Sequence, residues 1–216
     1  MHISPKDTLL LATRNPGKIR ELAPLLTPFG LRVLGLDHFP NLPETEETGQ
    51  SFLENALLKA SLACSGTGLI AMADDSGLEV EALGGQPGIH SARFSLLGNP
   101  AAGQDALGQD DRNNAKLLAL MKKIPQEKRQ ARYVCVIAAV APNGARASAQ
   151  GQWEGYILAE PRGNNGFGYD PLFFDPELAR SAAELSAEEK NARSHRALAL
   201  RRLLAIWPDF LGRASR

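Results

Sequence analysis

The dipeptide Asn143-Gly144 limits the possible folds of this chain more than any other feature, because it separates two strand-like runs. These runs are Arg132–Ala141 and Ala145–Gly155. Asn-Gly between two such runs is typical of a tight turn, since both residues tolerate the positive φ angles that the turn requires. The sequence therefore predicts a β-hairpin, and with it an antiparallel pair of strands, in the second half of the chain.

The first half of the chain alternates strand-like and helix-like segments, and this alternation is typical of a parallel arrangement. Helix starts are indicated by Asn15 followed by Pro16, and by two capping boxes, Ser51–Glu54 and Ser186–Glu189. Besides the hairpin, we expect strands at residues 8–12, 31–36, 69–73 and 172–174, and helices at 16–26, 51–64, 111–123, from 186 onward and at 196–207. Together with the hairpin, this order predicts an α/β fold with a mixed sheet flanked by helices.

Proline and glycine positions predict where these elements stop. Pro24 predicts a kink or an early stop in the first helix, and Pro208 an end to the last one. Loops are expected at residues 41–49, 84–88, 96–109 and 160–171, which are polar or rich in glycine. The loop at 96–109 has little periodicity, and we expect it to be mobile.

Composition excludes several classes of protein. The 216 residues suffice for a single domain, 1–216, made of two lobes, and 44% of them are hydrophobic. The 24 basic and 24 acidic residues balance, so we expect neither a nucleic-acid partner nor a membrane surface. The N-terminal apolar run is too short for a signal peptide, and Cys64 and Cys135 form no metal motif. We therefore expect a cytoplasmic protein with two free thiols.

The segment Thr13–Lys18 (TRNPGK) joins the first strand to the first helix, and it is a candidate phosphate site. Backbone N–H groups at a helix N-terminus favour anions, and Lys18 adds positive charge in the first turn. The segment lacks the spacing of a Walker A motif. The alternative interpretation is a well-capped helix with a solvated lysine.

Two adjacent carboxylates, Asp74 and Asp75, follow the apolar run 69–73 and precede Ser76. Adjacent side chains on an extended chain point to opposite faces, so one carboxylate can face a site while the other accepts structural hydrogen bonds. Carboxylates at the end of a strand suit Mg²⁺ or the activation of water as a general base. The alternative is an Asp-Ser-Gly turn with exposed acids.

Polar residues also interrupt the apolar helix after Ser51. Asn55 and Lys59 lie four residues apart and share one helix face. Lys59 either extends outward to solvent or reaches into a polar site. Just upstream, Glu46 and Glu47 either join a cation site or belong to a solvated acidic loop.

The late segments GFGYDP (166–171) and KNARSHR (190–196) carry an aromatic loop and a group of cations. An aromatic ring exposed on a glycine-rich loop suits stacking on a base, although the same residues in a tight turn can fill a core. Lys190, His195 and Arg196 suit recognition of a ligand's polar edge or a phosphate, or else are solvated charges at a helix end. Cation-binding acids, basic groups and an aromatic loop together indicate a nucleoside triphosphate site.

Five segments in this order resemble the Ham1-like family of inosine and xanthosine triphosphate pyrophosphatases. They are ATRNPGKIREL, SFLENALLKA, ADDSGLEVEALGGQPGIHSAR, GFGYDPLFF and SHRALAL, and the resemblance extends from about Leu9 to about Leu204. It implies an elongated mixed α/β sheet in two lobes with a central nucleotide cleft, and a homodimer. It also implies Mg²⁺-dependent hydrolysis of dITP, ITP and XTP to the monophosphate and pyrophosphate, by attack of water at the α-phosphorus.

The resemblance assigns roles to individual residues. The catalytic residues would be Asp75 as general base, with Lys18 and Lys59 near the phosphates. The metal ligands would be Asp75 and Glu47, with Asp74 close by. The substrate-binding residues would be Thr13, Arg14, Asn15, Pro16, Gly17, Lys18, Ser76, Phe167, Gly168, Tyr169, Asp170, Lys190, His195 and Arg196. Arg196 would donate to the 6-keto group of the purine, a group that adenine lacks.

Two features depart from the family pattern. Many members have glycine where this chain has Arg14, and arginine would be strained there if the position required positive φ. The loop 96–109 is also longer than usual by roughly eight to ten residues, a tolerable surface insertion.

Two other functions are consistent with the motifs. One is a pyrophosphatase of the Maf-like type, acting on a modified pyrimidine or another triphosphate, and the other is a nucleotide sensor that does not hydrolyse its ligand.

Overall fold

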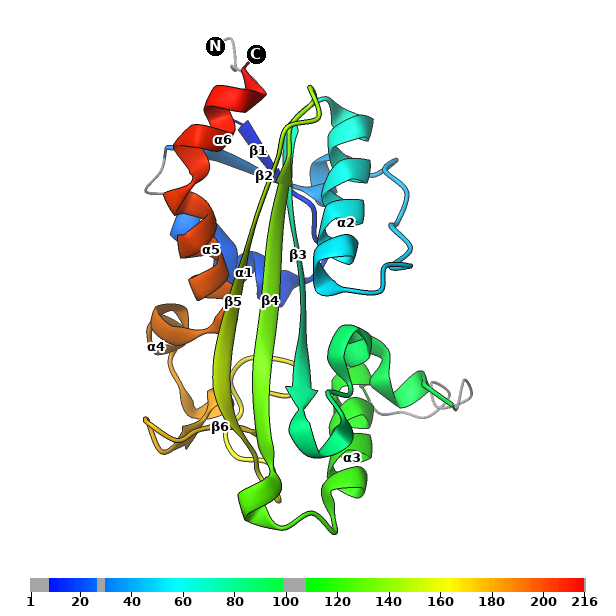
Figure 1. Cartoon of the computed structure of the whole chain (residues 1–216), viewed down its shortest axis with the longest axis vertical. Coiled ribbons are helices and arrows are strands. Elements are labelled where there is room, and N and C mark those ends of the chain that lie inside the picture. Colours follow the sequence, from blue (N-terminus) through cyan, green and yellow to red (C-terminus); the bar gives the residue numbers. More distant parts are fainter. Residues whose placement is uncertain (1–7, 27–29, 99–107, 216) are drawn as a thin grey trace. The chain divides into compact units, whose positions relative to one another are not determined.

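The computed structural model of the chain describes residues 8–26, 30–98 and 108–215 (Figure 1). Its strands are β1 (Thr8–Leu11), β2 (Arg32–Gly35), β3 (Ile70–Val80), β4 (Gln130–Val140), β5 (Arg146–Ile157), β6 (Phe173–Asp175) and β7 (Arg180–Ser181). Its α-helices are α1 (Pro16–Leu26), α2 (Phe52–Thr67), α3 (Gln109–Met121), α4 (Ala187–Arg193), α5 (His195–Ala205) and α6 (Trp207–Ala214). Short 3-10 helices include η3 (Leu36–His38), η4 (Glu81–Leu83), η5 (Gly88–Leu96), η7 (Gln126–Lys128) and η8 (Ala182–Glu184). Within these described parts, none of the helices is long and apolar enough to cross a bilayer.

The strands form one mixed sheet in the order β2-β1-β3-β4-β5-β6-β7. β1 pairs in parallel with β2 and β3, whereas β6 pairs antiparallel with β5 and β7. β4 and β5 are neighbours joined by the expected turn, in which the Gly144 N–H donates to the Ala141 carbonyl at 2.9 Å. The predicted hairpin and mixed α/β sheet are therefore confirmed.

The chain divides into two compact units. Unit 1 contains the described residues of Met1–Asp75, Cys135–Gly151 and Ser194–Arg216. Unit 2 contains those of Ser76–Val134 and Gln152–Arg193. The long strands β3, β4 and β5 contribute residues to both units.

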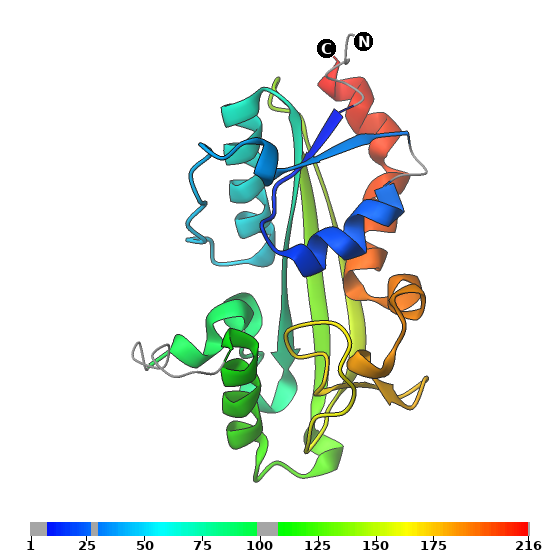
Figure 2. The same ribbon diagram turned by 180° about the vertical axis from the view of Figure 1, so that it is seen from behind.

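Unit 1 is a sheet covered by helices on both faces (Figure 2). Leu9 and Leu11 of β1 belong to a core with α1, α5 and α6, whereas Leu10 and Ala12 pack into a second core with α2. The alternation follows from the twofold period of a strand. A strand buried on both faces reads as a continuous apolar run, which is why β1 is so uniform in sequence.

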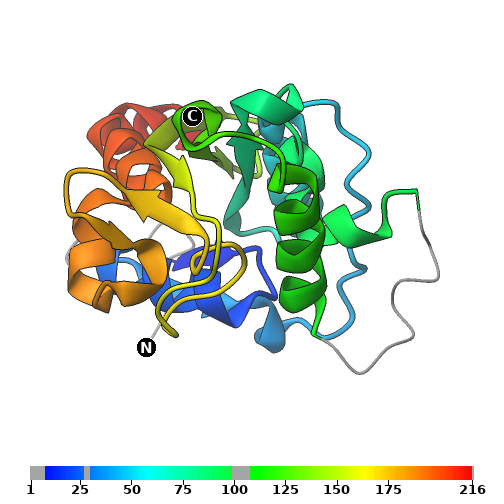
Figure 3. The same cartoon turned by 90° about the horizontal axis from the view of Figure 1, so that it is seen from below.

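Unit 2 has its own core, built around aromatic residues of the long strands. Tyr133 of β4 and Trp153 of β5 contact Phe173 of β6, with ring centroids 4.5 and 5.0 Å apart. Leu117 and Met121 of α3 complete this core, and α3 also packs against η5 (Figure 3).

The strand that carries Asp74 and Asp75 is longer than predicted. Residues 69–73 are the expected strand, but β3 continues to Val80, so the carboxylates lie inside the strand and not in an exposed Asp-Ser-Gly turn. Past Gly77 the strand lies against η5, where the Leu78 N–H donates to Ser91 Oγ at 2.9 Å. These polar contacts come from η5, which is distant in sequence, and they allow a strand where the local pattern indicated a turn.

The structure excludes one alternative of the Pro24 prediction and corrects the Pro208 prediction. α1 continues through Pro24 to Leu26 without an early stop. The last predicted helix ends at Ala205, and Pro208 then lies in the first turn of a new helix, α6, where a missing N–H costs nothing. Of the loop predicted at 96–109, residues 99–107 lie outside the described residues, Leu96 ends η5, and Gln109 already belongs to α3.

Candidate active site

The segment Thr13–Lys18 forms the N-terminus of α1, and Asn15 caps it as predicted. Asn15 Oδ1 accepts from the N–H groups of Gly17, at 2.8 Å, and Lys18, at 3.3 Å. Arg14 has no positive φ, so arginine is not strained there, and its guanidinium donates to the Leu42 carbonyl at 3.2 Å. Arg14, Asn15 and Pro16 are exposed, which suits a loop that receives an anion.

The helix is well capped, but Lys18 is not a solvated lysine, so that part of the alternative is wrong. Its ammonium pairs with Asp74 Oδ2 at 2.8 Å, and only 16% of its side chain is exposed. On the same carboxylate oxygen, Arg196 donates through Nε at 3.3 Å. Arg196 also pairs with Glu21 of α1. Four alternating charges thus connect α1 with β3 and α5.

Asp75 points to the opposite face of β3, where α2 supplies its partners. Lys59 Nζ lies 2.6 Å from Asp75 Oδ1 and 3.1 Å from Glu47 Oε1. Lys59 therefore reaches into a polar site and does not extend outward to solvent. Glu47 is half-buried and paired, so it is not part of a solvated loop.

The electrostatics separate the two adjacent carboxylates. Burial alone would raise the pKa of Asp74, but the charges of Lys18, Arg196 and Lys59 outweigh burial and hold that pKa well below its usual range. Burial raises the pKa of Asp75 above its ordinary value, although Lys59 opposes this shift. A raised pKa makes Asp75 the stronger base of the two, as general-base catalysis requires.

Asn55 is a site residue that the sequence motifs did not assign. It is fully buried, its Nδ2 donates to Asp75 Oδ2 at 3.3 Å, and its Oδ1 accepts from the Gly49 N–H at 2.8 Å. Asn55 and Lys59 thus each connect the acidic loop to Asp75. The signal was available in part, because the two residues share one face of an otherwise apolar helix.

The three carboxylates differ in how well they fit a divalent cation. Lys59 already bridges Glu47 and Asp75 with a positive charge, so these two can share a cation between them. Mg²⁺ is commonly held by one or two carboxylates together with substrate phosphates. Asp74 faces Lys18 and Arg196 instead, and the described residues contain no group of three or more acidic, His or Cys side chains arranged as a metal site. Glu47 and Asp75 therefore fit a divalent cation, whereas the contacts of Asp74 favour a role in positioning Lys18 and Arg196.

In unit 2, the loop GFGYDP has one of its two aromatic rings buried, where an exposed ring was expected. Tyr169 is buried, and its hydroxyl donates to the Ser91 carbonyl at 2.8 Å. The tight-turn alternative is therefore correct for Tyr169. Phe167 is half-buried, and Lys190 Nζ lies 5.0 Å from its ring centroid. Phe167 is thus the aromatic residue of this loop that remains accessible for stacking.

Asp170 anchors this loop from inside unit 2. Its carboxylate accepts from Lys190 Nζ at 2.5 Å, from Tyr133 Oη at 3.2 Å and from the Phe167 N–H at 2.9 Å. Tyr133 was not recognised from sequence, because nothing in the strand pattern distinguishes it from the core residues around it.

The cations predicted as one cluster divide between the two units. Lys190 belongs to unit 2, and His195 and Arg196 belong to unit 1. All three are buried, so they are not solvated charges at a helix end. Ser76, the first residue of unit 2, is half-buried on β3 directly after Asp75.

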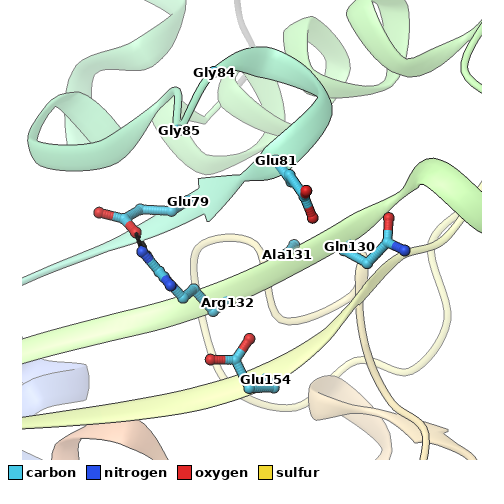
Figure 4. Close-up of a pocket in the computed structure, with 8 residues that line it drawn as sticks. All are labelled: Glu79, Glu81, Gly84, Gly85, Gln130, Ala131, Arg132 and Glu154. Carbon is cyan, nitrogen blue, oxygen red and sulfur yellow. Dashed lines mark hydrogen bonds and ion pairs between the residues drawn. The ribbon is translucent and has the colours of Figure 1, made fainter.

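Unit 2 also contains two pockets, and neither is lined by any of the predicted site residues. One, of about 370 Å³, is lined by acidic residues and Arg132, which pairs with Glu79 at 2.8 Å (Figure 4). The other, of about 750 Å³, is lined by Tyr156 and Phe174 among others. The predicted chemistry therefore lies outside both pockets.

Comparison with known proteins shows extensive similarity. The sequence model of the Ham1 family matches residues 9–206. The dITP/XTP pyrophosphatase of Nitratidesulfovibrio vulgaris is 56% identical over 205 residues, covering 95% of this chain and 98% of that protein. The dITP/XTP pyrophosphatase of Desulforamulus reducens is 50% identical over 198 residues, covering 92% and 94%.

Solved structures agree with the fold. A HAM1 protein from Coxiella burnetii is 41% identical, with a TM-score of 0.80, and covers 94% of this chain and 98% of its own. A nucleoside-triphosphatase, or dITP/XTP pyrophosphatase, from Mycobacterium abscessus is 45% identical, with a TM-score of 0.71, and covers 91% and 98%.

Proposed function

The chain belongs to the Ham1 family, and from this premise we propose that it hydrolyses dITP, ITP and XTP to the nucleoside monophosphate and pyrophosphate. The observation that supports this most is the buried carboxylate of Asp75, held by Lys59 and Asn55 beside Glu47. A buried base among cations suits hydrolysis of a polyanion, because it can activate water while the cations hold the phosphates.

The N-terminus of α1 binds the triphosphate in this proposal. The exposed residues of Thr13–Lys18 receive the phosphates, which the positive end of the α1 dipole and the ammonium of Lys18 attract. Lys18 and Lys59 stabilise the charge that develops on the pyrophosphate leaving group. Both lysines are preorganised, since Asp74 and Asp75 fix their positions before substrate arrives.

Asp75 accepts a proton from the water that attacks the α-phosphorus. Glu47 and Asp75 would hold a divalent cation, expected to be Mg²⁺. When bound, this cation supplies charge neutralisation for the triphosphate and lowers the pKa of water.

Recognition of the base uses Phe167 and the buried cations. Phe167 stacks on the purine, within a loop that also includes Gly168, Tyr169 and Asp170 and is anchored by Lys190. Ser76, His195 and Arg196 contact the nucleotide, and Arg196 donates to the 6-keto group. Adenine presents an amino group at this position and leaves that donor unpaired, which a buried site disfavours. We also expect a homodimer, as the family resemblance implies.

The test is pyrophosphate release from ITP, dITP, XTP, GTP, ATP and dTTP, with Mg²⁺ and with EDTA. We expect rapid release from the first three with Mg²⁺, and none with EDTA. Strong release from dTTP or ATP would contradict recognition of the 6-keto purine. The variant Asp75→Asn is expected to bind ITP without hydrolysing it, and unchanged turnover would remove Asp75 from the role of base. Tight binding of ITP by the unaltered protein without any turnover would indicate a sensor.

A further inference from the structure

The helix α3 holds the backbone of Gly168 on both sides of its Cα, through the N–H and the carbonyl. The Gly168 N–H donates to Asp110 Oδ2 at 2.7 Å, and the Gly168 carbonyl accepts from Asn114 Nδ2 at 2.9 Å. Asp110 and Asn114 are four residues apart, so they lie on one face of α3, one turn from each other. All three residues belong to unit 2, in which α3 packs against η5 (Figure 3).

The two bonds act on a glycine, the residue type with the greatest backbone freedom. Gly168 has φ +64, in the left-handed region, directly between Phe167 and Tyr169. Tyr169 and Asp170 are already fixed by buried bonds to Ser91 and Lys190. The Phe167 N–H is held by Asp170, and the bonds from α3 hold the backbone on the other side of Phe167, so together they set the direction of the Phe167 ring.

The side chains of Asp110 and Asn114 have the hydrogen-bonding groups that the backbone of Gly168 requires. Asp110 is an acceptor only, and it meets an N–H, whereas the amide of Asn114 meets a carbonyl through its NH₂ group. Asn114 Oδ1 is buried and accepts no hydrogen bond within the described residues, so its contact with Gly168 alone sets the orientation of the amide. Neither residue belongs to a motif that the sequence singled out.

We propose that Asp110 and Asn114 are positioning residues for base recognition, and that they act by holding the N–H and the carbonyl of Gly168 so that Phe167 is preorganised for stacking. This inference rests on the proposed function, in which Phe167 contacts the purine. A preorganised ring strengthens binding of the base in the ground state and in the transition state alike. Its loss therefore raises KM and leaves kcat nearly unchanged.

An alternative role for Asp110 is to stabilise the N-terminus of α3 by its charge. Asp111 provides the matched control, because it is a neighbouring carboxylate in the same first turn and is also exposed. If helix-end charge were the whole effect, Asp110→Ala and Asp111→Ala would behave alike.

The experiment compares Asp110→Ala, Asn114→Ala and the double variant with Asp111→Ala and the unaltered protein. Hydrogen exchange of the Gly168 amide, followed by NMR without nucleotide, tests the grip directly. Steady-state hydrolysis of dITP then gives KM and kcat. We expect faster exchange at Gly168 in Asp110→Ala and in the double variant. For Asp110→Ala we also expect a rise in KM of about three- to tenfold, with kcat within about twofold of the unaltered protein. Asp110→Asn keeps an acceptor oxygen and is expected to restore KM to within about threefold.

Equal KM values for Asp110→Ala and Asp111→Ala would overturn the inference, as would unchanged exchange at Gly168. A loss of kcat with KM unchanged would also overturn it. If the unaltered protein hydrolyses none of the nucleotides, the proposed function fails separately. Exchange at Gly168, and calorimetric binding of dITP by the same variants, then decide the inference by themselves. Circular dichroism confirms that each variant is folded, and the KM of Asn114→Ala, which removes the bond to the Gly168 carbonyl, tests the inference if Asp110→Ala does not fold.

Discussion

Lys18 and Asp74 form an ion pair of 2.8 Å that joins the first turn of α1 to the middle of β3. The neighbouring residue, Asp75, faces α2 on the other side of the strand and pairs with Lys59. Adjacent like charges are therefore tolerated because each has its own cations on its own face. This arrangement separates a structural carboxylate from a reactive one, and it leads to different predictions for the two.

Asp74→Asn is expected to lower stability at neutral pH, and by less as the pH falls below about 4. The folded-state pKa of Asp74 lies below the unfolded value, so its contribution to stability is fully present above about pH 4 and is lost as pH falls through the folded pKa. Breaking a buried ion pair typically costs about 3 kcal/mol, so we expect a deficit of that order in the free energy of unfolding at pH 7. Urea unfolding between pH 2.5 and 7 measures it, with the exposed Asp111→Asn as control. A deficit that stays constant down to pH 2.5 would show that Asp74 has no lowered pKa.

Lys59→Met is expected to abolish most turnover. Without the ammonium, Glu47 and Asp75 repel each other, and one cation fewer stabilises the leaving group. We expect kcat for dITP to fall by about 100-fold or more, as when a single electrostatic contact to the transition state is removed. Lys116→Met is the control, since Lys116 also donates two hydrogen bonds, but only to the carbonyls of Phe94 and Leu97. Turnover within a few-fold of normal in Lys59→Met would place Lys59 outside the catalytic residues.

The sequence predicted well wherever a contact is local. The caps at Asn15 and Ser51 each join residues within three positions, and both are present in the structure. The hairpin at Asn143-Gly144 is equally local, because the turn itself fixes which strands pair. The mixed sheet followed from these signals together with the alternation of buried residues.

Contacts between distant residues could not be predicted in this way. Glu21 pairs with Arg196, 175 positions away, and Tyr133 donates to Asp170, 37 positions away. The extension of β3 past Asp75 also depends on such contacts, because a buried carboxylate in a strand is stable only when other elements supply its partners. Local propensity at Asp-Ser-Gly favours a turn, and tertiary contacts override it.

Asn55→Ala is expected to weaken catalysis and not only stability. The substitution leaves the Gly49 N–H without its acceptor and removes a donor from Asp75 Oδ2. We expect kcat to fall by about tenfold, and the Mg²⁺ concentration for half-maximal rate to rise, because the loop that carries Glu47 loses its link to Asp75. Titration of metal into the protein by calorimetry measures the second effect without turnover.

Asn113→Ala provides the comparison for Asn55→Ala. Asn113 is also a buried helical asparagine, and it bonds to Ser91, Ala92 and Ser95 in unit 2. Both variants are expected to lose about 1–3 kcal/mol of stability, the cost of leaving buried partners unsatisfied. Only Asn55→Ala should alter the metal requirement. Equal effects of both variants on that requirement would reduce the role of Asn55 to packing.

Gly77→Ala is expected to destabilise the protein strongly, and Gly212→Ala to stabilise it slightly. A Cβ at Gly77 would lie 2.2 Å from the Gly88 carbonyl oxygen and 2.5 Å from Ser91 Oγ, so β3 would have to move away from η5. That movement breaks the bond from the Leu78 N–H to Ser91, and we expect a loss of about 2–4 kcal/mol. A Cβ at Gly212 on α6 meets nothing within 4 Å, and alanine in a helix is favoured over glycine by about 0.5–1 kcal/mol. Thermal unfolding of both variants measures these changes, and a stable Gly77→Ala would show that β3 and η5 are not packed as closely as the structure places them.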